Sequence, residues 1–222
     1  MTSRRGASRD SSDDASTPPD RAQLREAALS YLARYAATQA GLARVLDRRV
    51  DTWARKMGSR YESAAQDRAE VAAGVNAAKA VVREVVAALT QAGAVSDAAF
   101  AETRASSLRR AGRSHRGVVA GLAAKGVDAE TARAALDNEA VGGQEAEREA
   151  AVRLARKRRI GPFRAAESPD PPARLRELAI LARAGFAQNL ARQILGMERE
   201  AAEALLSAAP GPGADPHAQA GG

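Results

Sequence analysis

One motif constrains the fold of this chain more than any other: a helix, a glycine turn and a second helix occur twice. LAAKGVDAETARAAL (122–136) and LARAGFAQNLARQIL (181–195) align without gaps, and six of the fifteen positions are identical. In each copy a glycine stands where a helix end needs a left-handed residue, and the apolar residue after it can pack back on a leucine. These residues are Leu122, Gly126 and Val127 in the first copy, and Leu181, Gly185 and Phe186 in the second. The copies lie about 60 residues apart, which indicates three helices per unit.

The rest of the chain has the same helical character. Apolar residues recur at helical spacing, and no stretch alternates with the two-residue period of a strand. We therefore expect an all-α protein, an elongated array of three tandem three-helix repeats over residues 20–92, 96–138 and 144–206. A disordered N-terminal arm is expected at 1–19 and a disordered tail at 207–222, because both lack periodicity and are rich in residues that disfavour a packed core.

Local signals place several helix ends. Asp20 with Gln23 resembles a capping box, Thr38 can begin a second helix, and Asp170 precedes two prolines that suit a first helical turn. A polar stretch at 58–69 separates the second helix from the third, and the Pro-rich segment at 166–173 separates two helices of the last unit.

The segment GAVSDAAFAETRASSLRRAG (93–112) could open a catalytic site or begin a structural helix. Gly93 can end one helix and Ser96 can cap the next. Phe100 and Leu108 then share one helical face with small residues beside them. We expect Phe100 to be a core anchor.

Composition excludes several classes of protein. The chain has 222 residues and no cysteine, so it has no disulfide and no thiolate metal site, as in a cytoplasmic protein. It has neither an apolar run long enough to cross a membrane nor a signal peptide. Aromatic residues are only 3%, and alanine makes up much of the apolar content, which predicts thin seams between helices rather than one thick core.

No catalytic residue, cofactor or metal site is expected. His115 and His217 are the two histidines and lie far apart, and Ser114 beside His115 would point away from it on a helix. No phosphate-binding glycine loop of the P-loop type is present. The acidic run resembles a solvated face at a helix start and comprises Glu145, Glu147 and Glu149.

Basic residues form three clusters, and the net charge is +7. One cluster surrounds Gly112, a second precedes IGPF, and a third lines the helix that holds Trp53. The second includes Arg158, and the third comprises Arg44, Arg48, Arg49, Arg55 and Lys56. From the first two clusters we expect eight residues to bind phosphates or carboxylates of a partner: Arg109, Arg110, Arg113, Arg116, Arg153, Arg156, Lys157 and Arg159. The alternative is that these charges only solvate the surface or pair with local glutamates.

Several segments together resemble the RecX family, the regulators of the bacterial recombinase RecA. They are VVAALTQAGAVSDAAFAETRASSLRRAG (85–112), VVAGLAAKGVDAETARAAL (118–136), and ARKRRIGPFR with LRELAILARAGFAQNLARQIL (155–195), and the match runs over about 24–200. The residues that fit the family pattern are Gly93, Asp97, Phe100, Ala101, Gly112, Leu122, Gly126 and Val127.

The resemblance implies three tandem three-helix units that bind along the groove of the RecA–single-stranded DNA filament. It implies inhibition of RecA ATPase and strand exchange, a role in recombination, DNA repair and the SOS response, and no enzyme activity. Single- or double-stranded DNA could bind through the Arg patches, and no membrane or small-molecule substrate is expected.

Two alternatives remain open. A helix-turn-helix DNA-binding transcriptional regulator would use the segment 118–136, although its second helix offers only Glu130, Thr131 and Arg133 to base edges. A small hydrolase would use Ser114 and His115.

Overall fold

A computed structural model describes residues 17–60, 65–138, 143–165 and 170–208. Within these ranges the regular elements are ten α-helices and one short 3-10 helix, with no strand, which confirms the predicted all-α fold. The chain divides into two compact units, residues 1–97 and 98–222. Most of the predicted arm and tail lies outside the described residues.

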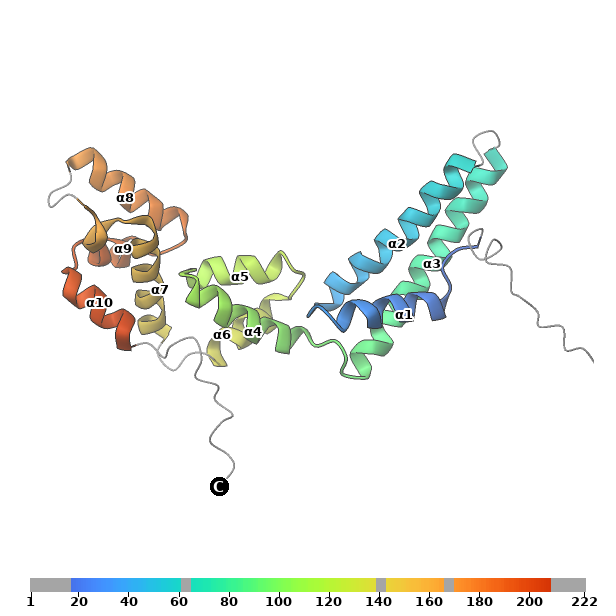
Figure 1. The fold of residues 1–222 in the computed structure, drawn as a ribbon, viewed down its shortest axis with the longest axis horizontal. Helices are drawn as coiled ribbons and strands as arrows, with labels where there is room; N and C mark the ends of the chain where they lie inside the picture. The colour runs from blue at the N-terminus through green and yellow to red at the C-terminus, as the bar shows by residue number, and fades with distance from the viewer. Residues whose placement is uncertain (1–16, 61–64, 139–142, 166–169, 209–222) are drawn as a thin grey trace, which may run out of the picture. The chain divides into compact units, whose positions relative to one another are not determined.

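The described part of the first unit, residues 17–60 and 65–97, forms three helices, α1 (Arg21–Leu32), α2 (Gln39–Arg60) and α3 (Ala65–Gln91). The long helices α2 and α3 run antiparallel, and α1 lies across them (Figure 1). The expected caps are present. The Asp20 side chain accepts from the Gln23 backbone N–H at 2.8 Å, and Thr38 Oγ1 accepts from the Gly41 N–H at 2.9 Å. The core of this unit is apolar and includes Leu24, Leu42, Leu46, Val50, Val82, Val85 and Leu89.

Two boundaries in this unit differ from expectation. The polar stretch 58–69 is helical wherever it is described, because α2 continues to Arg60 and α3 begins at Ala65. Ser59, Gln66 and Arg68 are exposed there, so their polarity reflects the solvent face of these helices. Pro19, which we assigned to the arm, is buried against the unit.

As far as the second unit is described, it contains seven α-helices and the 3-10 helix η2 (Gly161–Phe163). The helices are α4 (Asp97–Arg110), α5 (His115–Ala123), α6 (Ala129–Asn138), α7 (Gly143–Arg158), α8 (Pro171–Arg183), α9 (Gln188–Leu195) and α10 (Arg199–Ala208). Helices α4–α6 share one apolar cluster and α7–α10 share another. Asp170 caps α8 as expected, because its side chain accepts from the Ala173 N–H at 2.7 Å.

In the described residues of the range 144–206 there are four α-helices, one more than the three expected for a unit. The additional break falls at Gly196, which ends α9, after which α10 begins at Arg199. The apolar stripe continues across this break, so periodicity alone did not reveal it. The same range contains η2, which Glu177 holds: its carboxylate accepts from the Gly161 N–H at 3.3 Å and from the Arg164 guanidinium at 2.6 Å.

The glycine turns have the predicted geometry. Gly126 and Gly185 adopt φ values of 88° and 92°, in the left-handed region. The N–H of Val127 donates to the Leu122 carbonyl at 3.2 Å, and the N–H of Phe186 makes the same bond to Leu181 at 3.2 Å. These are the hydrogen bonds that close a helix in a Schellman motif. The repeat recognised in the sequence is therefore a repeat of turn geometry.

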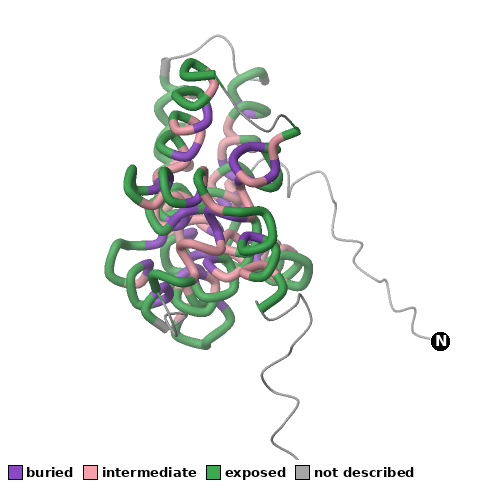
Figure 2. The backbone as a smooth tube through the Cα atoms, turned by 90° about the vertical axis from the view of Figure 1, so that its left-hand side faces the viewer, coloured by how far each residue is buried: buried purple, intermediate pink, exposed green. Residues whose placement is uncertain are grey.

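Alanine forms many of the contacts between helices. Buried positions occur as short patches along each helix, and the opposite faces are exposed (Figure 2). In α4 the fully buried residues are Ala101 and Ala105, and Phe100 is only partly buried against the same cluster. The expectation that Phe100 anchors the core therefore needs correction: small side chains let the helices approach, and Phe100 covers their edge.

We expect Gly185→Ala to destabilise the protein by about 2–4 kcal/mol, measured by urea denaturation. A left-handed alanine costs about 1–2 kcal/mol, and its Cβ would lie 2.7 Å from Ser114 Oγ, a buried hydrogen-bonded atom. The matched control is Gly93→Ala, which has a φ of 73° but no neighbour within 4 Å of the added Cβ. The control should lose only the stability that a left-handed alanine costs, because its Cβ contacts nothing. Equal losses of stability in the two variants would contradict this account.

Candidate functional site

The turn between α4 and α5 packs directly on α7. Gly112 adopts a φ of 80°, and a Cβ there would lie 3.1 Å from the Leu154 nitrogen and 3.2 Å from the Ala150 oxygen. A side chain at this position would therefore strike the backbone of α7. This close approach places the basic residues around Gly112 beside those at the end of α7.

Glu147 of α7 fixes this turn electrostatically. Its carboxylate accepts from the Arg109 guanidinium at 2.5 Å and from the His115 backbone N–H at 2.8 Å. The two side chains of the ion pair are 12% and 20% exposed. Glu147 thus satisfies a free N–H of the first turn of α5 and neutralises Arg109, which goes beyond the solvated face that we expected.

Ser114 has a structural role at the same place. It is fully buried, caps α5 by accepting from the Gly117 N–H at 3.0 Å, and donates to the Ala184 carbonyl at 2.6 Å. Its hydroxyl proton is therefore directed to a backbone carbonyl and not to His115. This geometry is evidence against the hydrolase alternative, which needs Ser114 as an activated nucleophile.

Four exposed cations surround a groove of about 420 Å³ next to this turn. They come from the α4–α5 turn and from the last turns of α7 and α8, and they are Arg113, Lys157, Arg158 and Arg183. Ile180 and Leu154 contribute apolar lining. Among the described residues none of the four cations forms an ion pair, so the groove offers uncompensated positive charge. We call it the basic groove.

A second basic hollow lies on the same unit. It has a volume of about 530 Å³ and is lined by Arg156, Arg159, Phe163 and Arg199, among others. Arg159 adopts a left-handed φ of 54°, the conformation that Gly112, Gly126 and Gly185 adopt after other helices. Arg199 lies over the Phe163 ring at 5.9 Å and pairs with Glu203 at 3.0 Å, so part of this charge is already compensated.

Comparison with known proteins identifies the family. A family model described as "RecX, second three-helix domain" matches residues 96–136. The chain is 40% identical over 173 residues to the regulatory protein RecX of Myxococcus xanthus, covering 78% of this chain and 83% of that protein. The chain belongs to the RecX family. It is also 41% identical over 119 residues to the regulatory protein RecX of Agrobacterium fabrum, covering 53% of this chain and 60% of that protein.

A solved structure supports the fold of this RecX family member. The crystal structure of RecX from Lactobacillus salivarius matches with a TM-score of 0.53 at 18% identity, over 83% of this chain and 96% of that chain. At this identity the likeness concerns the fold alone.

The eight cations expected to bind a partner are used in different ways in the structure. Arg109 pairs with Glu147, and Arg153 pairs with Glu149 at 3.3 Å, so both are engaged within the unit. Arg113 and Lys157 line the basic groove, and Arg156 and Arg159 line the second hollow. The remaining two are exposed, Arg110 beside Ser106 and Arg116 near Gly185. Arg183 is a further cation of the basic groove, and its only signal in the sequence is its place in the last turn of a helix before a left-handed glycine.

Metal sites and membrane-spanning helices are both absent from the described part of the chain. No cluster of three or more histidine, aspartate or glutamate side chains there has the arrangement of a metal site. None of the described helices combines the length and apolar composition that crossing a bilayer requires.

In the segment considered as a helix-turn-helix, the Asp128 carboxylate caps the start of α6. The Asp128 carboxylate accepts from the Thr131 hydroxyl at 2.7 Å and from the backbone N–H groups of Thr131 at 2.9 Å and Glu130 at 3.0 Å. These hydrogen bonds, with the Thr131 hydroxyl first, lower the pKa of Asp128. The Thr131 hydroxyl is thus used for capping, which removes one of the three side chains proposed to read bases.

We expect Asp128→Asn to lower the melting temperature at pH 7, because the ionised carboxylate stabilises the start of α6. A lowered pKa means that this stabilisation is complete above the unfolded-state pKa of about 3.9 and is lost as pH falls through the lower folded-state value. The difference between wild type and variant should therefore shrink as the pH falls below the unfolded-state pKa and vanish once the folded-state carboxyl is protonated. Asp137→Asn controls for the loss of one charge, and a difference that persists in acid would refute the assignment.

We expect Glu147→Ala to destabilise the second unit by about 2–3 kcal/mol, since it removes two hydrogen bonds to a charged group and leaves Arg109 unpaired. Thermal or urea unfolding followed by circular dichroism measures the loss. The control is Glu145→Ala, an exposed carboxylate in the first turn of α7, which should cost less than about 1 kcal/mol. Similar losses would mean that Glu147 contributes only through the helix dipole.

Proposed function

We propose that this protein is a regulator that binds the RecA–single-stranded DNA filament in the cytoplasm and inhibits RecA ATPase activity and strand exchange. The observation that carries the proposal is the basic groove on a chain of the RecX family. In the described part of this unit, Arg113, Lys157 and Arg158 make no ion pair, and they lie together because Gly112 packs on α7. Such a surface suits carboxylates of a protein partner or phosphates of DNA.

The proposed inhibition of RecA depends on a rigid support for the cations of the basic groove. The α4–α5 turn is fixed to α7 by Glu147 and to the α8–α9 turn by Ser114, so the cations of the groove are held at set positions. A rigid surface that contacts neighbouring subunits binds one filament conformation better than the others and shifts the equilibrium towards it. Inhibition would follow if that conformation is less active in ATP hydrolysis.

The variant Arg113→Glu/Lys157→Glu should weaken binding to the RecA-coated strand about tenfold or more, which corresponds to at least 1.4 kcal/mol. The matched control is Arg174→Glu/Arg192→Glu, which changes the net charge equally at exposed residues outside the groove. Binding is measured by fluorescence anisotropy, and helicity by circular dichroism should stay unchanged in both. Equal effects of the two variants would contradict a role for the groove.

The same assay separates the proposal from the helix-turn-helix alternative. Duplex DNA, bare single strands and RecA-coated strands are compared at two salt concentrations, because phosphate contacts weaken steeply with salt. Preference for the coated strand supports the regulator. Tight, sequence-dependent duplex binding that is lost in Arg133→Glu would support the transcriptional regulator instead.

A further inference from the structure

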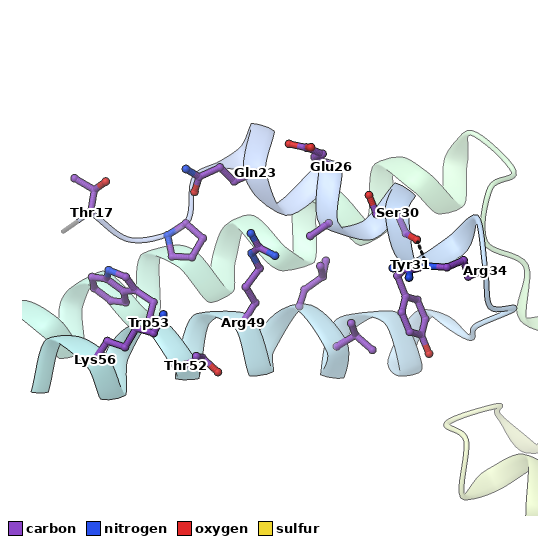
Figure 3. Close-up of a pocket in the computed structure, with 14 residues that line it drawn as sticks. Thr17, Gln23, Glu26, Ser30, Tyr31, Arg34, Arg49, Thr52, Trp53 and Lys56 are labelled. Carbon is purple, nitrogen blue, oxygen red and sulfur yellow. Dashed lines mark hydrogen bonds between the residues drawn. The ribbon is translucent and has the colours of Figure 1, made fainter. Parts of the chain in front are cut away.

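The first unit carries a polar groove between α1 and α2. It has a volume of about 930 Å³ and is lined by residues of both helices. Figure 3 shows Lys56 near one end, Arg49 in the middle, and Arg34 beside Tyr31 at the other end. We call it the α1–α2 groove.

Three cations line the α1–α2 groove in a row. Arg34, Arg49 and Lys56 are exposed, and Glu26 is the only carboxylate among the described residues that line the groove. Arg34 donates to the Ser30 carbonyl at 3.3 Å, whereas the side chains of Arg49 and Lys56 form no ion pair or hydrogen bond with another described residue. The groove therefore favours an extended anion that carries several charges.

Two acidic residues of α2 act on α3 and leave the charge of the groove uncompensated. Asp51 pairs with Lys79 of α3 at 2.9 Å. The hydrogen bond to Asp51, together with the charges of Asp51 and Asp47, raises the pKa of Lys79. Neither aspartate lines the α1–α2 groove.

A pair of tyrosines lies at the Arg34 end of the groove. Tyr31 lines the groove, and its ring centroid lies 5.1 Å from that of Tyr35, with an angle of 39° between the rings. Tyr35 is 56% exposed, in a chain with only 3% aromatic residues. Proteins that bind single-stranded nucleic acids combine a basic groove with aromatic rings on which bases stack. The first unit has both parts of such a site.

We propose that the α1–α2 groove binds an extended single strand of nucleic acid. The phosphates of the strand contact Arg34, Arg49 and Lys56, and one unpaired base stacks on Tyr35. The groove runs along α1, whose twelve residues span about 18 Å, so the site takes only a few nucleotides. This site belongs to the first unit alone and is separate from the basic groove of the second unit.

The tyrosines favour a single strand over the two other anions that could meet the cations. The bases of a duplex are paired and stacked on one another, so they do not reach Tyr35. An acidic peptide would pair with the cations and leave the stacking surface of Tyr35 unused. A site of this kind tolerates many sequences, because every base has a face that can stack.

Fluorescence anisotropy of a labelled thymidine oligonucleotide of about ten nucleotides, titrated with the full chain, tests the site. The variant Arg49→Glu/Lys56→Glu should bind it about tenfold or more weakly. The slope of log K against log salt should become shallower by about 1.4, since each phosphate contact with a single strand contributes about 0.7. Helicity by circular dichroism should stay unchanged.

The matched control is Arg48→Glu/Arg55→Glu. It changes the net charge equally, at two exposed residues of the same helix with the same spacing of seven, but neither residue lines the groove. The control should keep the affinity of the wild type within about threefold, because only long-range attraction changes. Equal losses in the two variants would overturn the proposal.

The stacking contact has its own variants. Tyr35→Ala should weaken binding of the oligonucleotide about tenfold, and Tyr35→Phe, which keeps the ring, should bind like the wild type. Equal binding by the alanine variant and the wild type would overturn the proposal. So would equal affinity of the wild type for the single strand, for a duplex of about the same length and for a peptide of about ten glutamates, because the groove would then select charge alone.

Photo-cross-linking locates the strand without any substitution. An oligonucleotide that carries 5-iododeoxyuridine joins to aromatic side chains near its bases, and trypsin releases Tyr31 in the peptide 26–34 and Tyr35 in the peptide 35–44. Mass spectrometry should find the label on the peptide 35–44. Labels found only on peptides of residues 98–222 would overturn the proposal. The bare strand carries no RecA, so that result would leave the proposed binding to the RecA filament standing.

Discussion

The second unit depends on backbone contacts that only glycine permits. At Gly112 the α4–α5 turn touches the backbone of α7, and at Gly185 the α8–α9 turn touches Ser114. Each glycine also ends its helix in the left-handed region, so one residue type both stops a helix and lets another element approach. With so few aromatic residues, the chain relies on these approaches and on buried alanines to bring its helices together.

The charges of the second unit have two separate roles. Arg109 and Arg153 are partly buried and are neutralised by glutamates of α7, so they hold the scaffold. Arg113 and Lys157 lie on the exposed side of the same elements and form no ion pair within the described residues. Salt screens exposed cations more strongly than it screens partly buried ion pairs. Binding through the basic groove should therefore weaken with ionic strength more than the stability of the unit does.

Local signals in the sequence predicted much of the fold, because they act over a few residues. The caps at Asp20, Thr38 and Asp170 and the turns at Gly126 and Gly185 appear as expected. The break at Gly196 was missed because the apolar stripe continues across it. The burial of Phe100 was overestimated because spacing defines a face but not how closely a neighbouring helix covers it.

The candidate site was less predictable, since it depends on pairs that are distant in sequence. Glu147 lies 38 residues from Arg109 and 32 from His115. No local pattern shows that this glutamate, and not Glu145, meets the turn. Arg183 joins the groove only because the fold brings the end of α8 beside the end of α7.

The bond from Ser114 to Ala184 has a consequence for synthesis, because it joins residues 70 positions apart. On the ribosome, α4 to α6 emerge well before α8, and the α4–α5 turn is then exposed without its buried contacts. Arg109 is also unpaired until Glu147 of α7 emerges, which happens before α8 does. The nascent second unit therefore passes first through a stage with one extra unpaired cation and then through one in which Ser114 still lacks the Ala184 carbonyl.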